Sequence, residues 1–355
     1  MRGKLLKIVK WARYLGIIIS RRRLTTLYGK YIQNILEKAE ARTNVIRHLG
    51  YHSDGLRPVT SVSMYKTLVR PMLEYAAQVL SYKHYYFTER KTVNVNEAPD
   101  MIKRLEKFQN RTLKKLVSSP KNTPPAVLRI LTGTMAIAAR IDILKLRYFW
   151  KLMHSGEENV AHIVYKEIRK KFLGGAVGYI HEIFNICCKY GIMDIWHGKC
   201  QKKVNPLARI KRVVEAHQLQ LDLEILRRSN CVYSKLRIFN DKKYTLEPWL
   251  QGVGRFASTK HRRMFLYAVL DIANYERKCG NCGAMVKDIT NHGLQECPRV
   301  TNQRIIFEMT MRLYNAPKEW EMRCKTQVMR NVLVKKSLLK VVCDFFIIIW
   351  NWDDE

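Results

Sequence analysis

The sequence predicts a mainly α-helical protein with a small zinc-binding segment near its C-terminus. Apolar residues recur at helical spacing along most of the chain, one short β-rich run precedes them, and four Cys and His residues cluster within a short stretch. At 355 residues with 47% hydrophobic residues, the chain is long enough and apolar enough for a packed core.

The strand and the helices are expected in a definite order. The run at 14–19 predicts one strand because β-branched residues dominate it. Amphipathic helices are expected over 31–49, 60–80, 101–117, 133–153, 206–228, 260–274, 302–314 and 328–350. Gly50 should end the first helix, and Pro71 should kink the second because it has no N–H to donate.

Four domains are expected from these segments. A Gly/Glu/Asn turn at 156–159 closes the first half and favours a boundary near 155. The expected domains are a helical domain at 1–155, a basic helical connection at 156–270, a zinc knuckle at 271–300 and C-terminal helices at 301–355.

The charge of the chain predicts a polyanionic partner. Against 64 Lys and Arg stand 30 Asp and Glu, which gives a formal charge of +34 and strong self-repulsion unless a polyanion is close by. Nucleic acid, RNA or DNA, is the expected partner. A membrane is not expected, because the most apolar run, 341–350, is short, contains Asp344 and suits a buried terminal helix.

The cysteines and the N-terminus indicate an intracellular protein, nuclear or cytoplasmic. Nine cysteines are sparse for a chain of 355 residues, so a reducing compartment is expected. The N-terminal twenty residues imitate a signal peptide, but Lys10 and Arg13 interrupt their apolar region. A mitochondrial presequence remains open as the alternative, because no acid occurs before Glu37.

The strongest local motif is Cys279-x2-Cys282-x9-His292-x4-Cys297. Three thiolates and an imidazole suit a tetrahedral Zn²⁺, and four protein ligands leave no position for a catalytic water. Structural zinc is therefore the expected cofactor, and two buried thiols with an unrelated histidine are the alternative. The knuckle is expected to stabilise the fold, with base stacking by Tyr275 or Met285 as the second possibility.

A second group of possible ligands is less suited to a metal. His197 and Cys200 follow the adjacent pair Cys187-Cys188. Adjacent cysteines rarely both bind one ion, so core thiols are expected here instead.

Clusters of Lys and Arg are the candidate phosphate contacts. The helix at 101–117 turns apolar residues inward and cations outward, which suits a sequence-independent grip on a phosphate backbone. An ordinary solvated helix face is the alternative. The expected nucleic-acid-binding residues are Arg21, Arg22, Arg23, Lys103, Arg104, Lys107, Arg111, Lys114, Lys115, Arg262 and Arg263.

Several of these segments together resemble the C-terminal part of a jockey-like non-LTR retrotransposon reverse transcriptase. The matching segments, in order, are Tyr14-Leu15-Gly16 with Arg22-Arg23-Leu24, the LVRPMLEY at 68–75, the FQNR at 108–111 with the prolines at 120 and 124, and the CCHC knuckle with Cys297-Pro298. The likeness covers 11–153 and 270–312. It implies a short palm-derived strand, a thumb-like helical bundle and a zinc knuckle, with the thumb following a template–product duplex.

The resemblance also bears on catalysis. Family members polymerise with palm aspartates that hold two Mg²⁺ ions, and these would precede Tyr14, where no acid occurs. The single Asp-Asp pair, Asp353-Asp354, resembles a charged tail. The expectation is a nucleic-acid-binding remnant without catalytic residues. The alternatives are the C-terminal portion of an active enzyme whose palm and fingers lie upstream, and a purely structural or interaction protein.

Overall fold

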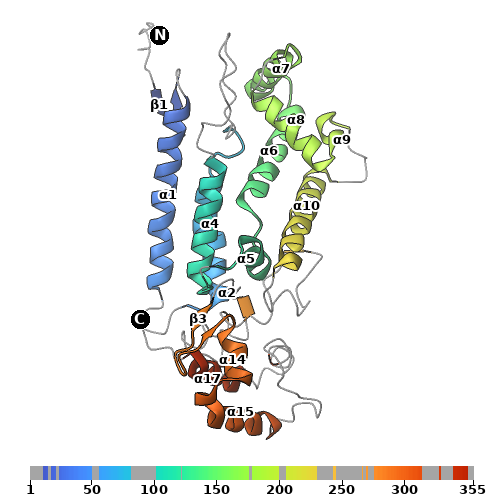
Figure 1. The fold of residues 1–355 in the computed structure, drawn as a ribbon. Coiled ribbons are helices and arrows are strands. Elements are labelled where there is room, and N and C mark those ends of the chain that lie inside the picture. Colours follow the sequence, from blue (N-terminus) through green and yellow to red (C-terminus); the bar gives the residue numbers. More distant parts are fainter. Residues whose placement is uncertain are drawn as a thin grey trace. The chain divides into compact units, whose positions relative to one another are not determined.

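The structure, a computed structural model, is mainly helical, as predicted (Figure 1). It describes residues 11–14, 17–20, 24–49, 56–80, 101–120, 122–175, 178–199, 205–229, 243–244, 266, 269–270, 276–313, 328 and 339–350. The chain forms two compact units, which are described separately. Unit 1 consists of Met1–Asn44, Lys66–Gln109 and Ala136–His217, and unit 2 of Val45–Tyr65, Asn110–Met135 and Gln218–Glu355.

The β-rich run near the N-terminus forms two strands, so the prediction of one strand at 14–19 was wrong. Strands β1 (Trp11–Tyr14) and β2 (Ile17–Ser20) pair antiparallel, with Tyr14 opposite Ile17 and Trp11 opposite Ser20. The chain therefore reverses direction inside the predicted strand. Helix α1 (Leu24–His48) follows and begins seven residues before the predicted start at 31. Gly50 lies outside the described residues.

The second predicted helix is divided around its proline. Helix α2 (Pro58–Met64) continues into a π-helical turn, η2 (Tyr65–Val69), and then into α3 (Arg70–Glu74), which ends six residues before the predicted 80. Pro71 lies in the first turn of α3. A proline cannot donate to a carbonyl in the preceding turn, so the backbone changes its hydrogen-bonding register at this point instead of continuing as one helix.

Helix α4 (Met101–Val117) has the predicted bounds. It is followed by α5 (Pro125–Thr132) and α6 (Ile137–Met153). Gly133 was predicted to begin α6, which is wrong. It ends α5 instead, with a left-handed φ of 58°. A glycine adopts this conformation without a steric penalty, which explains why the chain stops and restarts here.

Unit 1 continues with three helices after α6, and α6, α7 and α8 pack on one another (Figure 1). They are α7 (Val160–Leu173), α8 (Tyr179–Tyr190) and the short α9 (Met193–Trp196). A fully buried ion pair joins α6 to α8, since Lys145 Nζ donates to Glu182 Oε1 over 2.6 Å. Helix α10 (Pro206–Arg228) has the predicted bounds and runs from unit 1 into unit 2.

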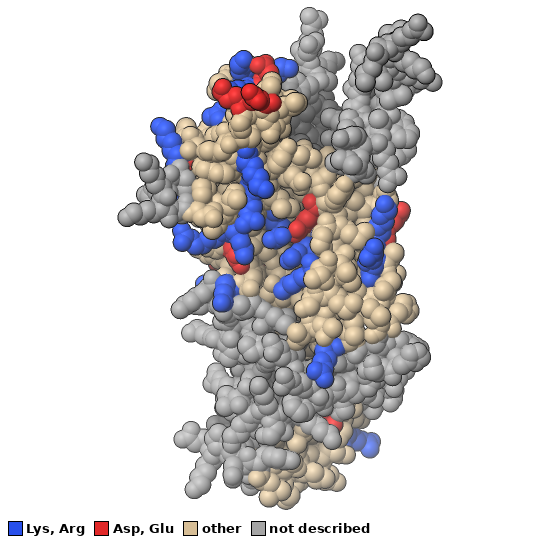
Figure 2. All heavy atoms as spheres, turned by 180° about the vertical axis from the view of Figure 1, so that it is seen from behind, with Lys and Arg blue, Asp and Glu red and all other residues tan. Residues whose placement is uncertain are grey.

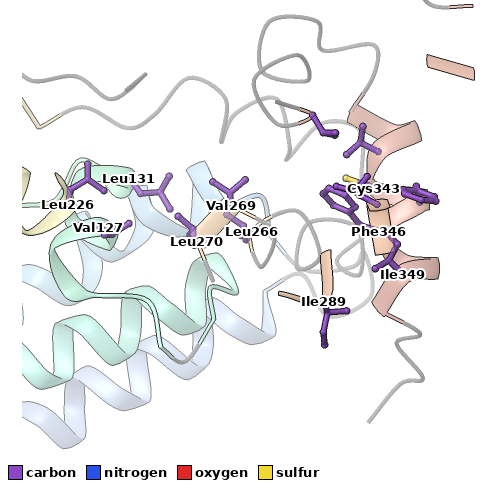
Figure 3. Close-up of a cluster of buried hydrophobic side chains, with 14 of the residues drawn as sticks. Val127, Leu131, Leu226, Leu266, Val269, Leu270, Ile289, Cys343, Phe346 and Ile349 are labelled. Atoms are coloured by element: carbon purple, nitrogen blue, oxygen red, sulfur yellow. The ribbon is translucent and has the colours of Figure 1, made fainter. Parts of the chain in front are cut away.

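The described C-terminal part of unit 2 contains a small sheet, three α-helices and a 3₁₀ turn. Strands β3 (Arg277–Lys278) and β4 (Met285–Val286) pair antiparallel and lead to α14 (Ile289–Gln295). A 3₁₀ turn, η4 (Pro298–Val300), then precedes α15 (Thr301–Leu313) and α17 (Leu339–Trp350). Most of the helix predicted at 260–274 lies outside the described residues. Of the helix predicted at 328–350, the C-terminal part is α17 and residues 329–338 lie outside the described residues. Leu266, Val269 and Leu270 are buried in the core of this unit (Figure 3).

Helix α17 is buried as the apolar run at 341–350 predicted. Val342, Cys343, Phe345, Phe346 and Ile349 belong to the core of unit 2, and Figure 3 shows three of them beside Ile289. Within the described part of the chain, no helix combines the length and the apolar character that crossing a bilayer requires.

Candidate metal centre and cationic helix

The structure brings the four predicted zinc ligands together in unit 2. The ligand atoms of Cys279, Cys282, His292 and Cys297 all lie within 4.8 Å of one another. Sγ of Cys279 lies 4.0 Å from Sγ of Cys297, and Sγ of Cys282 lies 3.2 Å from Nε2 of His292. Among the described residues, no second group of this kind occurs.

The first two ligands are held by the turn between β3 and β4. The N–H of Cys279 donates to the carbonyl of Ala284, and the N–H of Gly283 donates to the carbonyl of Cys279, both over 2.8 Å. Gly283 has a φ of 80°, which strains any residue with a Cβ. This explains the glycine directly after Cys282 in the sequence.

The other two ligands are placed by α14. Asp288 caps this helix by accepting from the N–H groups of Thr290 and Asn291 at 3.0 and 3.1 Å. The N–H of Cys297 donates to the carbonyl of His292 over 2.8 Å, so the helix end connects the two ligands directly. The spacing of four residues between His292 and Cys297 is therefore explained by one helical turn followed by the hydrogen bond that ends α14.

The histidine ring is oriented by a carboxylate. Nδ1 of His292 lies 3.4 Å from Oε2 of Glu296, one turn further along. A carboxylate on one ring nitrogen leaves the other nitrogen as the metal ligand and raises its basicity. Nε2 is the nitrogen that faces Cys282, so the ring is oriented to bind a metal ion through Nε2.

Two of the three thiols of the site, those of Cys282 and Cys297, differ in their pKa. A backbone hydrogen bond from Ala284, with a further contribution from His292, lowers the pKa of Cys282 to about 7. Burial raises the pKa of Cys297 to about 11. A thiol in this position must lose its proton to bind a metal, and a divalent ion supplies the positive charge that stabilises the thiolate.

The residues fit a structural zinc ion. Ligand atoms about 2.3 Å from a tetrahedral ion lie roughly 3.7 Å apart, close to the separations of the sulfur and nitrogen atoms here. Three sulfurs and one nitrogen are soft or borderline ligands, which suits zinc and disfavours Mg²⁺ and Ca²⁺. Because the protein supplies four ligands, the site would stabilise the fold and activate no water.

The metal site is tied directly to α17. Asn281, between the first two cysteines, donates from Nδ2 to the carbonyls of Ile348 and Ile349 at 3.1 and 2.7 Å. Gly293, next to the histidine ligand, lies so close to α17 that a Cβ there would meet Ile349 Cγ2 at 2.3 Å. The knuckle and the C-terminal helix therefore form one packed body.

Arg304 of α15 holds the other side of the site. Its guanidinium donates to the carbonyls of Gly293, Gln295 and Cys297 at 3.2, 2.9 and 2.8 Å. Neither Arg304 nor Asn281 was predicted as part of the site. Their role depends on backbone carbonyls that face them only after folding, and the spacing of the ligands carries no signal for them.

The expected phosphate contacts on α4 divide into two groups. Lys103, Lys107, Arg111 and Lys115 are exposed and recur every four residues. Arg104 is half-buried and donates to Oε1 of Gln33 on α1 over 2.7 Å. Lys114 is also half-buried, and burial lowers its pKa. Arg21, Arg22, Arg23, Arg262 and Arg263 lie outside the described residues.

Lys and Arg side chains are spread over the described part of the face drawn in Figure 2, and acids are sparse there except near one end.

The second group of possible ligands, Cys187, Cys188, His197 and Cys200, forms no metal site among the described residues. Cys187 is buried, which raises its pKa to about 12, as expected for a core thiol. Cys188 is exposed, so that expectation was wrong for it, and Cys200 is not described.

Comparison of the chain with known protein families, with curated proteins and with solved structures finds no match in any of the three.

Proposed function

We propose that this protein binds the phosphate backbone of nucleic acid along α4, and that a structural zinc ion holds the fold of its C-terminal region. The observation that carries the proposal is the row of exposed cations Lys103, Lys107, Arg111 and Lys115, hereafter the α4 row. No acid lies at any position of this i, i+4 series.

The dimensions of the α4 row suit a phosphate backbone. Twelve residues of helix extend about 18 Å, a length over which one strand of a duplex carries about five phosphates. Four cations at intervals of about 6 Å along one helix can each contact a phosphate in that length. Lys and Arg contacts of this kind position a backbone but read no base sequence, so binding should show little sequence preference.

The resemblance to a reverse transcriptase thumb gives this binding a context. The LVRPMLEY segment at 68–75 stabilises the fold, because Glu74 forms a bidentate ion pair with Arg140 of α6, with hydrogen bonds of 2.7 and 3.0 Å. The backbone carbonyl of Tyr75 accepts a hydrogen bond from the hydroxyl of Tyr31 over 3.1 Å. Helix α4 itself is held by other contacts, from Arg104 to Gln33 of α1 over 2.7 Å and from the N–H of Ala138 in α6 to Oε1 of Glu106 over 2.9 Å. The proposed ligand is a duplex, including RNA paired with DNA.

The test is the salt dependence of binding. A triple variant, Lys103→Gln, Lys107→Gln and Arg111→Gln, is compared with wild type on a DNA duplex and on an RNA–DNA hybrid. The control variant neutralises three exposed cations elsewhere, Lys199, Lys211 and Arg212, and so has the same net charge.

The slope of log K against log[salt] should become flatter by roughly 0.9 for each lost phosphate contact, so by about 2.7 in the triple variant on B-form DNA. The control should retain nearly the wild-type slope. Equal slopes in the two variants would show that binding is diffuse and that the α4 row has no special part in it.

A further inference from the structure

The outward face of α7 is apolar although α7 is already packed on its inner side. His162 and Tyr165 are buried, and Phe149 of α6 makes an edge contact with the Tyr165 ring at 5.7 Å. On the opposite side, side chains at helical spacing are exposed by 73, 50, 50 and 37%: these are Val160, Ile163, Val164 and Ile168, hereafter the α7 stripe. An apolar stripe of this kind indicates a docking surface.

The charges around the α7 stripe are balanced, in contrast to the rest of the chain. Three acids, Glu157, Glu158 and Glu167, and three lysines, Lys166, Lys170 and Lys171, flank it in a protein whose net charge is +34. The fourth cation of this segment, Arg169, is half-buried on the packed side, over the rings of Tyr165 and Trp196. Figure 2 shows acids and cations together at the end of the face where α7 lies. Acids beside an apolar stripe disfavour a nucleic acid, while a neutral patch can face a copy of itself without repulsion.

The order of the charges selects the orientation of such a pair. Glu157 and Glu158 precede the first turn of α7, whereas Lys170 and Lys171 lie in its last turn. In an antiparallel pair with Val164 at the two-fold axis, residue 157 lies opposite 171 and residue 158 opposite 170. Within the described part of the chain, Glu157 and Lys170 form solvent-exposed ion pairs with Lys166 and Glu167, which are weak and can exchange partners, whereas neither Glu158 nor Lys171 forms an ion pair.

We propose that α7 is a two-fold interface at which a second copy of this chain binds antiparallel. The α7 stripes of the two copies pack on each other, and acids at each end meet lysines of the partner. A two-fold interface requires this self-complementarity. One helix pair buries less than the roughly 800 Å² per partner of a standard interface, so the dimer should be weak and form at high protein concentration.

Sedimentation velocity of the full-length, zinc-loaded, nuclease-treated protein tests the proposal. One variant carries Lys170→Glu and Lys171→Glu, and a second carries Glu157→Lys and Glu158→Lys. Each alone places like charges across the axis and should remain monomeric at about 100 µM, a concentration at which a micromolar dimer is well populated. An equimolar mixture of the two should restore the dimer, because opposite charges then face each other.

Two single substitutions provide a matched control. Val164→Asp should weaken the dimer at least tenfold, because it places two carboxylates at the axis. Leu173 is 76% exposed and lies nine residues after Val164, which places it on the opposite side of the helix. Leu173→Asp introduces the same charge and should leave the dimer unchanged. A wild-type protein that stays monomeric, or a mixture that restores nothing, would overturn the proposal.

Discussion

Replacing Gly293 by alanine should loosen the C-terminal helix without touching a metal ligand. The added Cβ would lie 2.3, 2.6 and 2.9 Å from Cγ2, Cγ1 and Cδ1 of Ile349. All three distances are well below van der Waals contact, and Ile349 is only 1% exposed, so its side chain has no free space to enter. α17 must therefore shift away from α14.

The expected cost follows from two opposing effects. Overpacking of a closed core costs about 1–3 kcal/mol, and three short contacts place this site at the upper end. Alanine is also the better helix former by about 1 kcal/mol, which partly offsets the strain inside α14. The free energy of unfolding should fall by about 2 kcal/mol.

A double-mutant cycle isolates the contact. Ile349→Ala alone should cost about 2–5 kcal/mol because it leaves a cavity. In the double variant the clash disappears and the new methyl fills part of the cavity. The double variant should therefore cost about 2–3 kcal/mol less than the sum of the two single substitutions. Denaturant unfolding of the zinc-loaded protein measures these energies, and hydrogen exchange over 339–350 shows whether α17 is the element that loosens.

Gly156→Ala is the control, because no atom lies within 4 Å of a Cβ built there. It should leave the free energy of unfolding within about 0.5 kcal/mol of wild type, as surface substitutions do. If Gly293→Ala has as small an effect, or if the costs of Gly293→Ala and Ile349→Ala simply add, the packing of the knuckle against α17 is not as described.

Three further predictions concern the metal, a buried ion pair and a half-buried lysine. Cys282→Ser or a strong chelator should raise hydrogen exchange over 276–313 and 339–350 but not in α6 and α8, because structural zinc contributes on the order of 10 kcal/mol in small sites. Unchanged exchange, together with the absence of zinc by elemental analysis, would contradict this. Lys145→Met should cost about 3–5 kcal/mol because it removes the cation that neutralises the buried carboxylate of Glu182. Lys145→Met with Glu182→Leu should cost much less in chemical denaturation, and equal costs would show that the carboxylate is not the source of the effect. Burial, with a smaller effect of Arg70, lowers the pKa of Lys66 to about 8, so the folded state disfavours its charge and stability should rise between about pH 8 and pH 10.5. Lys66→Met should remove that rise in melts at pH values across this range, and a pH dependence equal to wild type would count against it.

The sequence predicted those features that depend on neighbours along the chain. The bounds of α4 and α10 and the four ligands between Cys279 and Cys297 follow from periodicity and spacing, which local chemistry determines. The hairpin of β1 and β2 was missed because two strands of four residues joined closely look like one apolar run. Gly133 was assigned to the start of a helix because the sequence does not distinguish a left-handed glycine that ends one helix from a glycine that begins the next.

Features that depend on distant contacts could not be predicted. Asn281 reaches the carbonyl of Ile349, 68 residues further on, and Arg104 reaches Gln33, 71 residues away. Both side chains are ordinary polar residues in the sequence, and only folding supplies their partners. The same holds for Lys114, which the helical wheel places near its exposed neighbours although it is half-buried in the structure.

Crosslinking of the protein to a duplex, with the linked residues identified by mass spectrometry, tests nucleic-acid binding along α4 most directly. A duplex with aldehyde-bearing nucleotides links to lysines that contact its backbone. We expect links to Lys103, Lys107 and Lys115, with few to the half-buried Lys114 or to Lys211 on α10. Links that avoid α4 and collect on another part of the chain would contradict this expectation.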